Sequence, residues 1–114
     1  MDITEIKAIL EKSKVKLDNI YVAMDIEVEG KKLLSLEAQT VEDGFWEDKK
    51  NSTKTISSMN TIKAKINSYN KTLDLYDNTY AAYELLKEDE DAELLKEIEK
   101  TLPELEEKID ELET

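Results

Sequence analysis

Apolar residues recur every three or four positions along most of this sequence, with polar and charged residues between them. That spacing is the period of an α-helix with one apolar face. It predicts four helices, over residues 3–24, 31–41, 49–87 and 91–113. The second is the shortest and has the weakest pattern. The sequence therefore predicts an all-α fold with three long helices and one short helix.

The predicted helix over residues 49–87 carries two rows of side chains that repeat every seven residues. The rows are Met59, Ile66, Leu73 and Tyr80, and Ile62, Tyr69, Tyr76 and Tyr83. Heptad repeats pack helices side by side as in coiled coils. If it runs from about Asn51 to Lys87, this helix is roughly 55 Å long at 1.5 Å per residue. We therefore expect an elongated antiparallel helical bundle with coiled-coil-like packing, formed by residues 1–114 as a single domain.

Interruptions of the apolar pattern predict where the helices end. Residues 25–30 interrupt it after the first helix, and Gly30 is the residue expected to separate the first two helices. The acidic link of residues 88–91 is short, so the third and fourth helices should form an antiparallel hairpin.

Pro103 lies inside the apolar row of the fourth helix. A proline there removes one backbone hydrogen bond and clashes with the preceding turn. We favour a kinked helix, because the apolar period continues undisturbed through Pro103. The alternative is a true break, since Thr101 and Glu104 have the spacing of a capping box.

The composition excludes most enzyme classes. The chain has no cysteine and no histidine, so thiol nucleophiles, Cys-ligated zinc and the commonest general base are absent. Acidic pairs on the surface are expected to be solvated faces. We therefore expect no catalytic residue, no metal and no cofactor. No apolar run is long enough for a membrane span and the first residues are already charged, which predicts a cytoplasmic protein without a membrane partner.

The charge is unevenly distributed. All 16 basic residues are lysine and the net charge is -12, which argues against a DNA partner and against general nucleic-acid binding. Residues 49–72 nevertheless carry 6 lysines and no acid. Lys50, Lys54 and Lys65 fall on one side of the predicted helix, where they are candidates for contact with RNA phosphates. The alternative is that acids of the first two helices neutralise them.

Two aromatic groups have a structural and a functional interpretation. Gly44, Phe45 and Trp46 form a turn that contains the only Phe and the only Trp of the chain. We favour a packing plug for this turn, and the alternative is an exposed contact for a partner. The four tyrosines of the heptad rows resemble a base-stacking platform, but their position favours the core.

The acidic run of residues 88–91 raises the question of calcium binding. It lacks the alternating ligands, central glycine and final glutamate of an EF-hand loop. We interpret it as a solvated turn that leads into a helix, where acids are favourable.

These features together resemble the amino-terminal domain of the bacterial peptide chain release factor 2 family. The resemblance spans essentially the whole chain. Its most specific part is the turn Asp43-Gly44-Phe45-Trp46-Glu47-Asp48, and the acidic segment 25–32, the acidic hinge 88–91 and the Glu/Leu/Lys-rich last helix add to it. The family commonly has proline at the position of Gly44 and none at position 103.

The resemblance implies a non-catalytic module of a translation termination factor. Family members read stop codons with a Ser-Pro-Phe loop and trigger hydrolysis with a Gly-Gly-Gln loop, both in later domains, and neither loop is present here. The implied partners are the RNA and protein of the ribosomal stalk base and the class II release factor GTPase. The alternative is a free-standing acidic helical-bundle interaction or scaffold protein, for which we expect homo-oligomers of the isolated chain.

Overall fold

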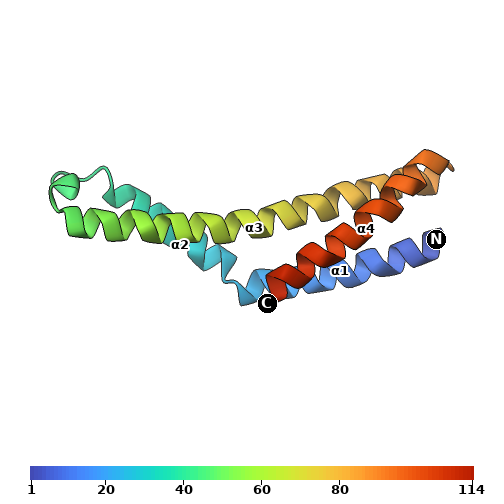
Figure 1. Cartoon of the computed structure of the whole chain (residues 1–114), viewed down its shortest axis with the longest axis horizontal. Coiled ribbons are helices and arrows are strands. Elements are labelled where there is room, and N and C mark those ends of the chain that lie inside the picture. Colours follow the sequence, from blue (N-terminus) through green and yellow to red (C-terminus); the bar gives the residue numbers. More distant parts are fainter. The chain divides into compact units, whose positions relative to one another are not determined.

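The computed structural model describes residues 1–114 and contains four α-helices, one 3-10 turn and no strand (Figure 1). The elements are α1 (Ile3–Ala23), α2 (Ile26–Gln39), η1 (Phe45–Glu47), α3 (Lys49–Glu88) and α4 (Ala92–Glu113). The predicted all-α class, with three long helices and one short helix, is confirmed. None of these helices combines the length and apolarity needed to cross a bilayer.

The chain forms two compact units, a division that the prediction of a single domain does not anticipate. Residues 1–21 and 69–114 form one unit, which we call the three-helix unit. Residues 22–68 form the other, which we call the two-helix unit. Helix α3 is continuous and contributes its first half to the two-helix unit and its second half to the three-helix unit.

Ion pairs and ring contacts define the helix directions in the three-helix unit. The amino group of Met1 lies 3.1 Å from Glu99, and Lys16 lies 3.8 Å from Glu113, so α1 and α4 are parallel. Helix α4 folds back along α3, as Figure 1 shows, and both α1 and α4 are therefore antiparallel to it. The rings of Tyr21 and Tyr69, 5.5 Å apart, join the end of α1 to the middle of α3.

The core of the three-helix unit comes mainly from α1 and α4. Its fully enclosed side chains are Ile6, Leu10, Leu17, Ile98, Leu102, Leu105 and Ile109. Helix α3 adds three buried tyrosines, Tyr69, Tyr76 and Tyr83, from one of the predicted heptad rows.

The heptad row of Met59, Ile66, Leu73 and Tyr80 is a correction to the predicted core, because it is not buried along its whole length. Tyr80 is 42% exposed, whereas Thr72 and Thr79, each one position earlier than a predicted core residue, are buried. Two helices cover this half of α3, and the side that faces both is displaced from the predicted row. Burying Thr79 leaves no unpaired hydroxyl, because its Oγ1 donates to the carbonyl of Leu75 at 2.7 Å.

The two-helix unit pairs α2 with the first half of α3 in antiparallel orientation. Its buried apolar residues are Ile26, Phe45, Met59 and Ile62. The predicted start of the second helix near residue 31 is wrong, since α2 begins at Ile26 and includes Gly30. The break between α1 and α2 lies instead at Asp25, whose φ is 51°. Aspartate tolerates this left-handed conformation better than most residues, whereas a glycine inside a helix costs only about 1 kcal/mol relative to alanine.

Helix α4 has no break at Pro103. It begins at Ala92, after Asp91, whose carboxylate accepts hydrogen bonds from the backbone N–H groups of Glu93 and Leu94, and it continues through Pro103 to Glu113. The capping-box break is not formed, because the Thr101 hydroxyl donates to the carbonyl of Glu97 at 2.8 Å. A residue that bonds back into the preceding turn belongs to the interior of a helix.

Candidate functional site

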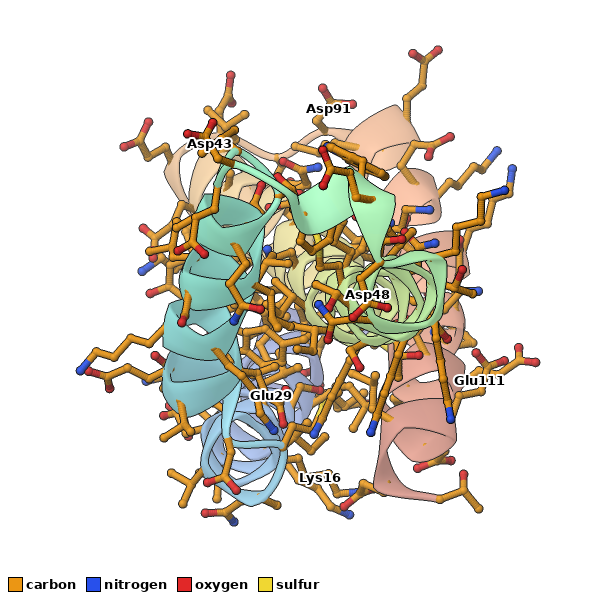
Figure 2. All side chains as sticks on the ribbon, turned by 90° about the vertical axis from the view of Figure 1, so that its left-hand side faces the viewer. Lys16, Glu29, Asp43, Asp48, Asp91 and Glu111 are labelled. Carbon is orange, nitrogen blue, oxygen red and sulfur yellow. The ribbon has the colours of Figure 1, made fainter.

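The three candidate lysines all lie on α3 within the two-helix unit, but their environments differ. Lys50 and Lys54 are one helical turn apart, exposed, and without an acidic group within ion-pair distance. Lys65 is half-buried and lies 3.5 Å from the carboxylate of Glu29 on α2. Figure 2 shows Glu29 on α2 beside α3. The structure thus leaves two unpaired cations and partly neutralises the third.

Of the two unpaired candidate lysines, Lys50 lies where a cation is unfavourable for the helix itself. The first turn of α3 contains Lys49 and Lys50 and no acid, although the positive end of the helix dipole disfavours cations there. Asp48 compensates in part, because its carboxylate accepts a hydrogen bond from the backbone N–H of Asn51 at 3.1 Å. Figure 2 shows Asp48 at the start of α3.

The turn between α2 and α3 separates its two aromatic residues. Gly44 has a φ of 80°, a left-handed conformation that favours glycine. Phe45 is buried, whereas Trp46 is 61% exposed, and the two rings meet edge to face at 4.8 Å. The packing plug therefore consists of Phe45 alone. Neither hydrophobicity nor spacing in the sequence distinguishes these two adjacent rings.

A second surface feature lies in the three-helix unit. A groove of about 270 Å³ runs between α1 and α3 and is lined by Lys7, Leu10, Glu11, Tyr76, Tyr80, Tyr83 and Lys87. Its charges are paired, with Lys7 at 3.9 Å from Glu11 and Lys87 at 3.4 Å from Glu84. In the sequence, the feature that indicates this groove is the helical spacing of Tyr76, Tyr80 and Tyr83. Of these three tyrosines, only Tyr80 is exposed.

Three ionisable groups of this groove have raised pKa values. A hydrogen bond with Glu84 raises the pKa of Tyr80 and also that of Lys87. Burial raises the pKa of Tyr76. A general base or nucleophile needs a group that is deprotonated near neutral pH, so these shifts run opposite to the direction that catalysis by these groups requires.

The acidic link before α4 has a structural role. Asp91 Oδ1 accepts hydrogen bonds from Glu93 and Leu94 at 3.0 and 3.1 Å. Such a cap is worth about 1 kcal/mol to a helix. No group of three or more acidic residues in the chain is arranged to hold a metal ion.

Comparison with known proteins points to one family. The sequence model of the PCRF domain matches residues 30–114. Peptide chain release factor 2 of Lactiplantibacillus plantarum is 29% identical over 99 residues, which cover 87% of this chain and 26% of that protein. The same factor from Staphylococcus epidermidis is 29% identical over 113 residues, 99% of this chain and 30% of that protein.

A third relative has the same name. Peptide chain release factor 2 of Aliarcobacter butzleri is 32% identical over 100 residues, which cover 85% of this chain and 27% of that protein. The chain thus spans less than a third of the length of each of these curated relatives. The match covers both the two-helix unit and the three-helix unit.

Proposed function

We propose a function from one established premise: this chain belongs to the PCRF domain family. It is a non-catalytic module of a translation termination factor that contacts the ribosome in the cytoplasm. The observation that carries the proposal is the family match over residues 30–114, and the names of the relatives support it. The sequence contains neither a Gly-Gly-Gln nor a Ser-Pro-Phe segment, so this chain by itself neither reads a codon nor triggers hydrolysis.

The proposed place of contact is the base of the ribosomal stalk, beside the site of translational GTPases such as the class II release factor. Lys50 and Lys54 supply the contact with ribosomal RNA phosphates, because they are exposed and unpaired on one side of α3. Lys65 contributes less, since Glu29 lies within 3.5 Å of it. Each phosphate neutralised by a lysine releases counterions, which makes binding depend on salt.

The charge reversal Lys50→Glu/Lys54→Glu tests this assignment. We expect ribosome binding, measured by co-sedimentation with purified ribosomes, to weaken at low salt. The slope of log K against log salt should shrink by roughly one to two, because each lost phosphate contact removes about 0.7 to 0.9. An unchanged slope would contradict the role of these lysines.

The chain offers a matched control. Lys96 and Lys100 on α4 are also one turn apart, exposed and unpaired. The variant Lys96→Glu/Lys100→Glu changes the net charge by the same amount in the three-helix unit, and we expect it to bind ribosomes with the slope of the unmodified chain. Equal effects of both double variants would mean that only total charge matters. Failure of the unmodified chain to co-sediment at all would contradict the proposed function.

A further inference from the structure

An exposed apolar patch at the turn after α2 has no part in the proposed contact with RNA. Its members are Val41 and Trp46, which are 84% and 61% exposed. Nε1 of Trp46 donates to the carbonyl of Thr40 at 3.0 Å. Because Thr40 immediately precedes Val41, this bond fixes the indole to the backbone next to the valine. We call these two residues the Trp46 patch.

The Trp46 patch is held rigidly. Phe45 is buried in the two-helix unit and meets the Trp46 ring edge to face. Backbone hydrogen bonds of 3.2 Å close the turn, from Phe45 N to the carbonyl of Glu42 and from Glu47 N to the carbonyl of Gly44. An aromatic ring fixed before binding loses little conformational entropy when a partner covers it, and tryptophan is the residue type most enriched among binding hot spots.

The charges around the patch select the kind of partner. Glu42, Asp43 and Glu47 are all exposed beside it in the sequence and the turn, and Figure 2 shows Asp43 in the loop after α2. Carboxylates repel phosphate and attract cations. The face of an indole ring attracts Lys and Arg side chains as well. Both features therefore favour a basic polypeptide over a nucleic acid.

We infer that the Trp46 patch docks a basic protein segment, with a Lys or Arg side chain stacked on the indole and neighbouring cations paired with the three carboxylates. The inference rests on the proposed function, because it takes the basic segment to belong to a protein of the ribosome. It assigns the two-helix unit two contacts of opposite charge, Lys50 and Lys54 for RNA and the Trp46 patch for protein.

Trp46 is the only tryptophan of the chain, so its fluorescence reports on the patch directly. The first test titrates the chain with a deca-arginine peptide and, separately, with polyuridylate RNA. We expect the peptide, and not the RNA, to change the emission of Trp46. Trp46→Ala should weaken binding of the labelled peptide, measured by anisotropy, about tenfold. Leu85→Ala, which truncates another exposed apolar residue, should leave it unchanged.

A second pair of variants separates local recognition from total charge. Glu42→Gln/Asp43→Asn/Glu47→Gln removes the three carboxylates at the patch, and Glu88→Gln/Asp89→Asn/Glu90→Gln removes three at the link before α4. We expect the first variant to weaken peptide binding several-fold more than the second. Equal weakening, an unchanged Trp46 emission, or a response to RNA alone would overturn the inference.

Ribosome co-sedimentation distinguishes failure of this inference from failure of the proposed function. If the unmodified chain binds ribosomes and Trp46→Ala binds as well, the inference fails and the proposed function stands. If the unmodified chain does not bind ribosomes, the proposed function fails, and the peptide titration still decides the chemistry of the patch. If circular dichroism shows that Trp46→Ala is unfolded, Trp46→Phe, which keeps a ring, should show intermediate peptide affinity, and full affinity would overturn the inference.

Discussion

The three-helix unit encloses seven large apolar side chains almost completely, whereas the two-helix unit encloses none to that degree. All seven side chains with less than 2% exposure belong to the three-helix unit. In the two-helix unit, Ile26, Phe45, Met59 and Ile62 retain 6–9% exposure. Two helices cannot surround an interior as three can. The difference suggests a division of roles, with stability in the three-helix unit and the candidate contact surfaces in the two-helix unit.

The largest expected effect is a test of core enclosure with matched substitutions. Ile98→Ala in the three-helix unit should lower the free energy of unfolding by about 3 to 4 kcal/mol, because it empties a fully enclosed site. Ile62→Ala in the two-helix unit should cost about 2 kcal/mol, because neighbours and water reach a less enclosed site. Urea unfolding followed by circular dichroism measures both. A larger loss for Ile62→Ala would reverse the comparison.

The two glycines of the chain, both in the two-helix unit, should respond to alanine in opposite directions. Gly44→Ala should destabilise by about 1 kcal/mol, because the φ of 80° strains any residue with a Cβ. Space does not add to this cost, since the nearest atom would lie 3.8 Å away. Gly30→Ala should stabilise by about 0.5 to 1 kcal/mol, because Gly30 lies inside α2 and a Cβ there meets nothing within 4 Å. Thermal unfolding of both variants checks the signs.

The smallest expected effect concerns alkaline pH and the three-helix unit, which contains all groups with shifted pKa values. Burial raises the pKa of Tyr69 and of Tyr76. A group with a raised pKa in the folded state stabilises fully below its unfolded pKa, near 10 for tyrosine, and this contribution is lost as pH rises toward the folded value. The free energy of unfolding should therefore fall above about pH 10. Tyr69→Phe/Tyr76→Phe should make this fall shallower in denaturant titrations, and an unchanged fall would contradict the assignment.

The sequence predicted the helices well where their burial is one-sided and regular. In α1 and α4 the apolar residues spaced at three- and four-residue steps include Ile6, Leu10, Ile98 and Leu102, which are almost wholly buried. Such rows are local, since they depend only on the 3.6-residue period. The predicted start of α2 was wrong, because a glycine permits a break in a helix without requiring one. The break occurs instead at Asp25, which adopts the left-handed conformation.

The candidate site was predictable only as a set of residue types. The lysine window on α3 was visible in the sequence, but the pairing of Lys65 with Glu29 brings together residues 36 positions apart. The two rings of the turn were also visible. Their separation into a buried Phe45 and an exposed Trp46 depends on the direction in which the turn leaves α2.

Periodicity thus determined the all-α class, composition determined the lack of histidine and cysteine chemistry, and charge determined the position of the basic window. The sequence suffices for these properties because they depend only on residue types and on residues that are close together in the chain. The tertiary structure decided which side of α3 is covered, and hence that Thr79 is buried and Tyr80 exposed. It also decided which lysines remain unpaired. Burial and pairing depend on helices that are distant in the chain, and the free-energy differences between alternative helix faces are too small to be read from one helix alone.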